Sequence, residues 1–230
     1  MGRQQELQFR TWGGARASSG RKPAGARPGR PHAVRPALQP TCPVHVTIRV
    51  VNGVGRLRTK EMYLAIRAAT AAVAARRDFR IVHLTVQHDH LHLLVEAGDA
   101  HALARGVRAF EISAARRINR VERRRGGVFA DRYHARILTT PTAVRIALDY
   151  VLNNWRKHGE DKLRRAREWP VDPYSTGPRF TGWRERVTFP VPATYRPLVT
   201  APAETWLLRG GWRCGGDISI RDVPGWLRGT

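Results

Sequence analysis

The 230-residue sequence contains only two cysteines, Cys42 and Cys214, which lie far apart in the chain. Two isolated cysteines provide neither a disulfide framework nor a cysteine zinc site, and their scarcity favours a reducing, intracellular location. Long apolar runs are also missing, since no stretch reaches the length that crosses a bilayer. The basic N-terminus lacks the apolar segment of a signal peptide, so the sequence predicts a soluble, cytoplasmic protein without a membrane partner.

Acidic residues are scarce as well. The chain has 18 Asp and Glu against 41 Lys and Arg, which gives a formal net charge of +23. Such an excess points to a polyanionic partner, and nucleic acid is the first candidate. Nearly all the basic residues are arginine, as a GC-rich coding sequence would produce, but that bias does not explain why carboxylates are so few.

The length predicts one core domain with appendages. Residues 1–42 are rich in Arg, Gly and Pro with little aliphatic periodicity, so we expect a disordered basic arm. Its Gly-Arg-Lys-Pro motif at residues 20–23 suits a minor-groove hook, and a non-specific phosphate-binding tail is the alternative. Residues 161–230 scatter tryptophans among Pro and Gly, and we interpret them as an extension. These tryptophans either pack on the core, residues 43–160, or stack on unpaired bases.

Within the core, four segments alternate apolar and polar residues as strands do, and three segments repeat apolar residues at helical spacing. Thr59 and Thr140 suit helix N-caps, and Pro141 suits a first helical turn. The order strand, helix, strand, strand, helix, strand, helix fits an α+β fold with a ferredoxin-like antiparallel sheet. One sheet face would pack on helices, and the other would be a wet working surface. The predicted strands span about residues 44–50, 82–87, 88–96 and 133–138, and the predicted helices about residues 60–77, 100–125 and 141–159.

The third predicted strand carries a histidine pair. Alternation sends Leu91 and Leu93 to one face, and His90 and His92 to the other. Two imidazoles spaced in this way can converge on one metal ion. A His-x-His pair is also often solvated or hydrogen-bonded within a sheet, so the pair alone leaves both interpretations open.

The last predicted helix places Tyr150 and Asn154 one turn apart, just off its buried stripe. A phenol can attack phosphorus to form a phosphotyrosine, and an amide oxygen one turn away can complete a metal site begun by two histidines. The alternative is that Tyr150 borders the core with its hydroxyl in water and that Asn154 is a surface residue.

Three stretches together resemble the one-tyrosine HUH transposases, a family that includes the REP-associated tyrosine transposases. They are residues 90–95, residues 131–136 and residues 149–159. The resemblance covers about residues 44–160, and it implies an HUH nuclease fold. It matches His90 and His92 to the histidine pair, Tyr150 to the nucleophile and Asn154 to the third metal ligand. Many members have Pro-Asn or Pro-Asp before the first histidine, where this chain has Gln87-His88-Asp89, so whether His88 also approaches the metal stays open.

The resemblance implies a Mg²⁺- or Mn²⁺-dependent transposase and endonuclease that cuts and rejoins single-stranded, hairpin-forming DNA. The products would be a 5′-phosphotyrosine and a free 3′-hydroxyl. The protein would act as a monomer or homodimer. Arginines on the core are candidates for DNA contact, although a charged helix face is often simply solvated: Arg49, Arg105, Arg116, Arg123, Arg132 and Arg136.

Two other functions remain open at this point. A catalytically silent module could bind DNA or RNA on the open face of a ferredoxin-like sheet, and surface aromatics on the middle strands would favour it. A zinc-dependent hydrolase could use the histidines without Tyr150.

Overall fold

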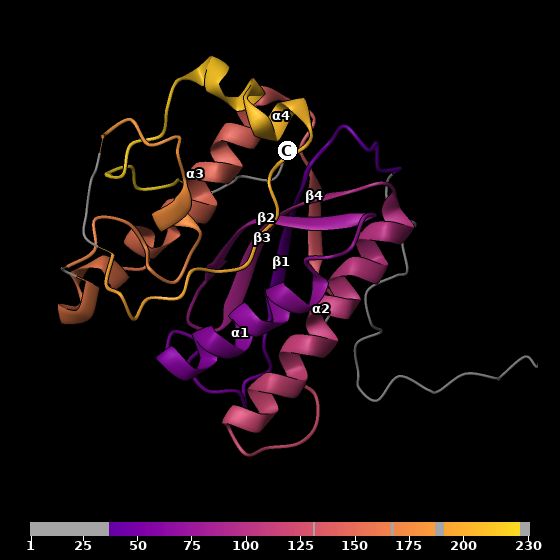
Figure 1. The fold of residues 1–230 in the computed structure, drawn as a ribbon, viewed down its shortest axis with the longest axis vertical. Helices are drawn as coiled ribbons and strands as arrows, with labels where there is room; N and C mark the ends of the chain where they lie inside the picture. The colour runs from indigo at the N-terminus through magenta and orange to yellow at the C-terminus, as the bar shows by residue number, and fades with distance from the viewer. Residues whose placement is uncertain (1–36, 131, 167, 187–190, 226–230) are drawn as a thin grey trace, which may run out of the picture. The chain divides into compact units, whose positions relative to one another are not determined.

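The computed structural model describes residues 37–130, 132–166, 168–186 and 191–225. Most of the predicted basic arm, including its Gly-Arg-Lys-Pro motif, therefore lies outside the described residues. The predicted order of strands and helices is confirmed (Figure 1). The core elements are β1 Val44–Arg49, α1 Lys60–Val73, β2 Phe79–Val86, β3 His90–Ala97, α2 Ala100–Val121, β4 His134–Ile137 and α3 Pro141–Lys157. They are followed by α4 Trp206–Arg209 and by short 3₁₀ helices, η1 Glu160–Lys162, η2 Arg164–Ala166, η3 Gly177–Arg179 and η4 Gly211–Gly215.

Each long helix begins at a side chain that accepts a hydrogen bond from the backbone amide three residues further on. The distances are 3.3 Å for Thr59, 2.6 Å for Asp99 and 3.1 Å for Thr140. Such caps satisfy amides that have no partner within the helix. Pro141 occupies the first turn of α3, where its missing N–H costs nothing.

The four strands form one antiparallel sheet in the order β2-β3-β1-β4. The central pair, β1 and β3, is not consecutive in the chain, and β2 and β4 form the edges. This is the strand order of a ferredoxin-like fold, so the predicted α+β class is confirmed. The order matters for function because it brings residues 45–49 beside residues 90–94.

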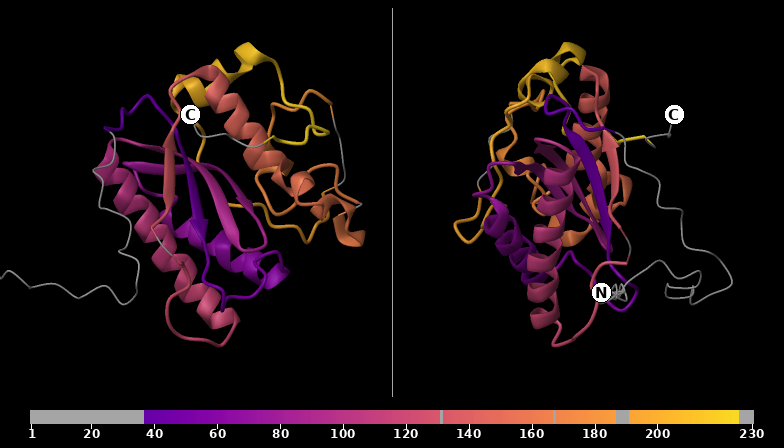
Figure 2. Two further views of the ribbon diagram at one scale, coloured as in Figure 1. Left: turned by 180° about the vertical axis from the view of Figure 1, so that it is seen from behind. Right: turned by 90° about the vertical axis from the view of Figure 1, so that its right-hand side faces the viewer.

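Helices α1 and α2 lie side by side on one face of the sheet (Figure 2). Their apolar stripes bury the aliphatic side chains of β1 and β3 in a common cluster that includes Ile48 and Leu93. The two layers approach closely at Gly106 of α2, where a Cβ atom would lie 2.1 Å from the ring of Phe79. A larger residue at position 106 would force either the Phe79 ring or the helix to move.

Helix α3 covers the opposite face of the sheet together with the C-terminal segment, which we define as residues 160–225. Leu148 and Leu152 of α3 form a second apolar cluster with Trp212 and Ile218 of that segment. The prediction that this face of the sheet is a wet working surface is therefore wrong. Thr85 and His92 point to this face yet are only 0% and 4% exposed, because α3 and the C-terminal segment exclude water from it.

The C-terminal segment also covers the free edge of β2. The amide of Val86 donates to the carbonyl of Tyr174, and the amide of Thr176 donates to the carbonyl of Leu84, both at 2.9 Å. These bonds satisfy backbone groups that an edge strand would otherwise expose. The expectation that the extension packs tryptophan on the core holds for Trp212, which is buried, but is wrong for Trp206, which is exposed. Trp226 lies outside the described residues.

None of the described helices is long and apolar enough to cross a membrane. The predicted division of the chain at residues 42 and 160 stays a prediction. Leu38, which lies in the predicted arm, is buried in the main apolar cluster.

Candidate active site

The histidine pair lies where the two central strands meet. His92 pairs with Thr47 across the sheet, and His90 pairs with Arg49. Because side chains at paired positions share a face, β1 places His45, Thr47 and Arg49 beside the two histidines. The centroids of the His90 and His92 rings are 4.7 Å apart, with the rings nearly perpendicular.

His92 has one ring nitrogen engaged and one available. Its Nδ1 lies 3.1 Å from Thr47 Oγ1 and 3.2 Å from His45 Nε2, while its Nε2 is buried and has no hydrogen-bond partner among the described residues. Burial lowers the pKa of His92 well below its ordinary value, and the neighbouring His45 lowers it further. A neutral ring that donates Nδ1–H presents an Nε2 lone pair, the form that binds a metal.

His90 is oriented in the same way by a carboxylate. Its Nδ1 lies 2.6 Å from Asp89 Oδ1, and the other oxygen of Asp89 is 3.7 Å from Arg49 Nη1. Burial lowers the pKa of His90, and Asp89 opposes this change. Partial burial alone would raise the pKa of Asp89, but the bond to His90 and the charge of Arg49 hold it below its usual value. An anionic carboxylate on Nδ1 leaves Nε2 free, as in many histidine ligands of metals.

Helix α3 brings Tyr150 to these histidines. The centroid of its ring is 5.0 Å from that of His92 and 5.8 Å from that of His45, in edge-on contacts. Burial raises the pKa of the phenol, and Arg49 opposes this change. Because the pKa stays above its ordinary value, the phenol is protonated at neutral pH, so attack on phosphorus requires alignment and charge neutralisation by its surroundings.

Asn154, one helical turn from Tyr150, is completely buried, and neither Oδ1 nor Nδ2 has a hydrogen-bond partner among the described residues. An unsatisfied buried amide costs roughly 1–3 kcal/mol, so the fold retains it at a penalty. A metal ion would satisfy the Oδ1 atom. The interpretation of Asn154 as a surface residue is wrong.

Two imidazole nitrogens and an amide oxygen would give a divalent cation three donors and leave its other positions to phosphate oxygens and water. The part of the chain that the structure describes offers no group of three His, Cys, Asp or Glu side chains able to hold a metal. A catalytic zinc ion usually takes three ligands of those types. The choice between magnesium or manganese and zinc therefore stays a prediction.

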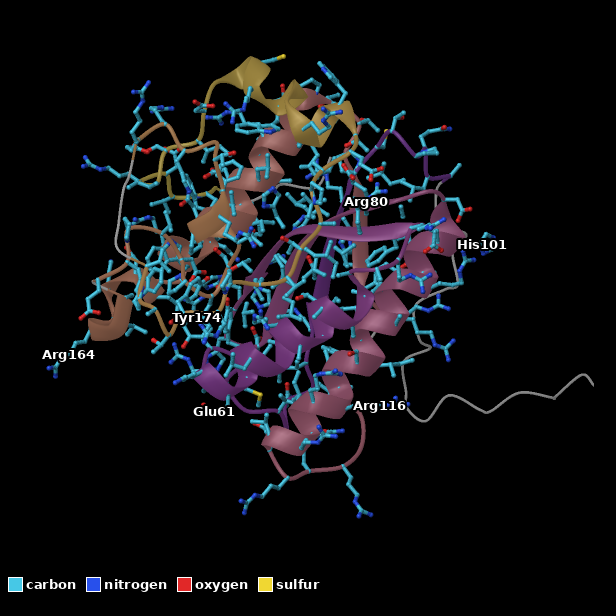
Figure 3. The ribbon with its side chains drawn as sticks, viewed as in Figure 1. Glu61, Arg80, His101, Arg116, Arg164 and Tyr174 are labelled. Atoms are coloured by element: carbon cyan, nitrogen blue, oxygen red, sulfur yellow. The ribbon has the colours of Figure 1, made fainter. Side chains whose placement is uncertain are left out.

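The candidate DNA-binding arginines do not form one surface. Arg49 and Arg136 lie next to the site, since their charges act on Tyr150 and His45 respectively. Arg105 is paired with Asp78 at 3.0 Å. Arg116 projects from α2, on the other side of the sheet from α3 (Figure 3). Arg123 and Arg132 are exposed on the segments before β4.

His88 is exposed in the turn between β2 and β3, and it lines a cavity of about 240 Å³ beside His90. Tyr133 packs against the cluster on the α1 and α2 side of the sheet, away from the histidines. Asp131, part of the second stretch of resemblance, lies outside the described residues.

Sequence reasoning missed the side chains that orient the histidines, His45 and Asp89. Burial lowers the pKa of His45 to about 4, so its ring is neutral near His92. The sequence held a local signal for Asp89, because a carboxylate that directly precedes His90 can contact its ring. No local signal existed for His45, because its position depends on which strand pairs with β1.

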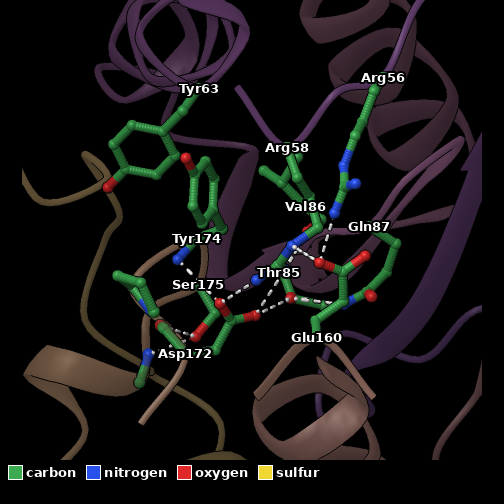
Figure 4. Close-up of polar contacts among 12 residues, drawn as sticks. Arg56, Arg58, Tyr63, Thr85, Val86, Gln87, Glu160, Asp172, Tyr174 and Ser175 are labelled. Atoms are coloured by element: carbon green, nitrogen blue, oxygen red, sulfur yellow. Dashed lines mark hydrogen bonds and ion pairs between the residues drawn. The ribbon is translucent and has the colours of Figure 1, made fainter. Parts of the chain in front are cut away.

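A buried ionic network supports the site from the β2 edge (Figure 4). Arg58 donates two hydrogen bonds to Asp172, at 2.8 and 3.0 Å, and one to the carbonyl of Val86 at 2.7 Å. Its Nε atom lies 3.4 Å from Glu160, just beyond the end of α3. Arg58 thus ties the end of the tyrosine helix to the strand that leads into the histidine hairpin.

Removing the charge of Asp172 is expected to destabilise the fold. Arg58 and Asp172 are 7% and 0% exposed, and a buried arginine without its carboxylate costs about 3 kcal/mol or more. The free energy of unfolding of Asp172→Asn, measured by urea titration, should fall by that amount. Asp217→Asn removes a partner of the half-exposed Arg213 and should cost less than about 1 kcal/mol. Equal losses in the two variants would contradict the structural role of the network.

The C-terminal segment also binds the outer side of α3, opposite the sheet. Three side chains of α3 donate to its backbone carbonyls: Arg145 to Gly216 at 2.9 Å, Asn153 to Ser219 at 2.9 Å, and Arg156 to Ile220 at 2.6 Å. The side chains at 150 and 154 are left facing the histidines. The segment therefore fixes the rotation of the helix that carries Tyr150.

Comparison with known proteins places this geometry in a family context. Residues 39–154 match the family model described as IS200-like transposase, and this range contains both histidines, Tyr150 and Asn154. Among solved structures, the chain is similar to a REP-associated tyrosine transposase bound to a REP hairpin, with a TM-score of 0.51 and 20% identity over 65% of this chain and 84% of that chain. A protein of Deinococcus radiodurans R1 described as a transposase gives a TM-score of 0.36 and 18% identity over 59% of this chain and 97% of that chain. Among proteins with curated functions, none matches this chain.

Proposed function

Because the chain belongs to the IS200-like transposase family, we propose that it cuts and rejoins single-stranded, hairpin-forming DNA through a covalent bond to Tyr150. The observation that carries this proposal is the set of unpartnered polar atoms around the tyrosine. The Nε2 atom of His92 and the amide of Asn154 are buried without hydrogen-bond partners among the residues that the structure describes, and the Tyr150 ring contacts His92. A structural role alone would leave these atoms unsatisfied at a cost.

In the proposed reaction, the Tyr150 oxygen attacks the scissile phosphorus while the bond from phosphorus to the 3′-oxygen breaks. The phenol loses its proton to solvent, and the leaving 3′-oxygen takes one up, so the step is a transesterification without net consumption of water. The products are a 5′-phosphotyrosine and a 3′-hydroxyl, and attack by another 3′-hydroxyl reverses the reaction.

His90, His92 and Asn154 would hold a Mg²⁺ or Mn²⁺ ion. When bound, the ion supplies positive charge that polarises the phosphate. Asp89 and Thr47 each contact the Nδ1 atom of one imidazole, and this orients the Nε2 atom of that ring toward the proposed metal ion. Arg49 and Arg136 would contact the phosphates flanking the cut.

The comparison structure holds a REP hairpin, and this supports a hairpin as the DNA partner here. All four proposed catalytic groups belong to one chain, so we propose that one copy is sufficient for cleavage. The silent binding module is less well supported. The middle strands present His and Thr in place of aromatic rings, and α3 covers the face on which an RNA strand would lie.

The test is cleavage of a hairpin oligonucleotide labelled on the 3′ side of the cut. With Mg²⁺ or Mn²⁺, the protein should give a labelled adduct that survives denaturation, and a chelator should abolish it until metal is restored. His92→Ala should lose the adduct while it retains DNA binding, because affinity comes largely from phosphate contacts. Cleavage that resists the chelator, or that proceeds without an adduct, would rule out this mechanism.

A further inference from the structure

A cavity of about 240 Å³ lies beside the proposed metal ligand His90, at the turn that joins β2 to β3. It is lined by Gln87, His88, Asp89, His90, His158 and Glu160. The backbone N–H of Gln87 donates to the carbonyl of His90 at 2.9 Å, so these two residues continue the pairing that places Val86 opposite Leu91. Because side chains at paired positions share a face, the side chain of Gln87 lies next to the His90 ring.

The side-chain amide of Gln87 has a fixed orientation (Figure 4). Its Nε2 atom donates to Thr85 Oγ1 at 2.9 Å, and that hydroxyl donates to Asp172 Oδ2 at 3.2 Å. A hydroxyl has one proton and a carboxylate oxygen only accepts, so Thr85 can offer Gln87 only a lone pair. The group that faces Thr85 must therefore be the NH₂ group of the amide, and the Oε1 atom points away from it.

The Oε1 atom of Gln87 is buried and has no hydrogen-bond partner among the described residues. A buried acceptor without a donor lowers stability, so a ligand that brings a donor to it is bound favourably. The carboxylates of Asp89 and Glu160 line the same cavity and are acceptors too. Both are paired with arginines, which balance their charge. The cavity therefore suits a neutral ligand with N–H donors better than a second cation.

The position of the cavity indicates which donor would reach it. His90 is a proposed ligand of the ion that polarises the scissile phosphate, and Gln87 is its neighbour across the hairpin. A nucleotide joined to that phosphate would therefore have its base close to the cavity. A volume of about 240 Å³ is smaller than the cavities that enclose drug-sized ligands, and it suits a single base. The exposed ring of His88, in the same lining, can stack on such a base.

We propose that this cavity receives the base of a nucleotide next to the scissile phosphate, and that Gln87 selects a base with an exocyclic amino group. This inference rests on the proposed function and names part of its substrate. Adenine, cytosine and guanine can donate an amino N–H to Oε1, whereas thymine carries a carbonyl oxygen in the place of the cytosine amino group. A carbonyl that faces Oε1 leaves two acceptors unsatisfied, so the site rejects thymine. Gln87 lies in none of the three stretches that resemble the transposase family.

The experiment uses a pool of hairpins whose nucleotides on both sides of the cut are randomised. The full-length protein reacts with the pool in Mg²⁺ or Mn²⁺, and the rate for each sequence follows from its loss from the uncut DNA. At one flanking position, wild type should cut thymine about 10-fold or more slowly than the preferred base. Gln87→Met removes the acceptor and keeps the length of the side chain. This variant should cut all bases at that position within about twofold of one another.

A second pair of substrates isolates the amino group. At the discriminating position, the preferred base is replaced by an analogue that lacks only this group, such as purine for adenine. Wild type should slow about 10-fold, and Gln87→Met less than about twofold. Gln87→Glu keeps an acceptor in this place and should keep the preference. Each ratio compares two substrates on one protein preparation, so partial unfolding of a variant does not change it.

The inference is overturned if wild type discriminates against thymine at no flanking position, or if Gln87→Met keeps the wild-type preference. In either case a wild-type adduct would leave the proposed function standing. If no sequence in the pool gives an adduct, the proposed function itself fails, and the inference fails with it.

Discussion

Tyr150→Phe is expected to abolish the covalent protein–DNA adduct while DNA binding and folding remain. The substitution removes only the attacking oxygen and keeps the ring that packs edge-on against His92 and His45. Loss of a nucleophile usually reduces turnover by several orders of magnitude, because no neighbouring group replaces it. The measurement is the denaturation-resistant adduct on a 3′-labelled hairpin, together with the DNA affinity and the thermal midpoint.

The matched control is Tyr133→Phe. Tyr133 packs against the cluster on the α1 and α2 side of the sheet, so its hydroxyl should be irrelevant to cleavage. An adduct that persists in Tyr150→Phe and vanishes in Tyr133→Phe would show that Tyr133, the residue before β4, is the nucleophile. Adduct formation in both single variants would show that neither tyrosine is the nucleophile.

Asn154→Leu is expected to abolish cleavage and to raise the stability of the fold. The side chain is completely buried, and neither polar atom has a hydrogen-bond partner in the described part of the chain, so a leucine of similar size removes an unsatisfied amide. Without divalent metal, the free energy of unfolding should rise by roughly 1–3 kcal/mol. Cleavage should fall to background, because the proposed metal site loses the amide oxygen of Asn154.

A gain in stability together with a loss of cleavage would indicate a functional residue, because proteins often keep functional residues that lower their stability. Leu152→Ala, a neighbouring buried position on α3, is the control and should lose about 2–5 kcal/mol. An Asn154→Leu variant that is less stable than wild type, or that still cleaves, would contradict the role proposed for this amide. The comparison uses urea titration in chelator and single-turnover cleavage in Mg²⁺.

The order of elements followed from local patterns. Thr59, Thr140 and Pro141 predicted helix starts that the structure confirms, because capping depends on residues only a few positions apart. The alternation in residues 90–95 predicted which side chains share a face with His90 and His92, since side chains alternate strictly along a strand. The helical spacing of Tyr150 and Asn154 likewise required no knowledge of the rest of the fold.

Features that depend on contacts between distant segments could not be predicted from local patterns. The polar face was expected to be wet, yet residues 172–176, outside the predicted core, cover the β2 edge and bury Thr85. The candidate arginines looked equivalent in the sequence, but Arg105 pairs with Asp78 whereas Arg49 lies beside Tyr150. Charge along a chain does not reveal which face of the folded protein will carry it.

By itself, then, the sequence determined the strands, the helices and the residue types able to do phosphoryl-transfer chemistry, because propensity, capping and periodicity act over a few residues. Only the tertiary structure decided that β1 pairs with β3, which puts His45 and Thr47 on His92. It also decided the rotation of α3, which the C-terminal segment holds through Arg145, Asn153 and Arg156. Contacts between residues 45 and 92, or 153 and 219, arise from the burial of whole surfaces, and no local pattern in the chain specifies them.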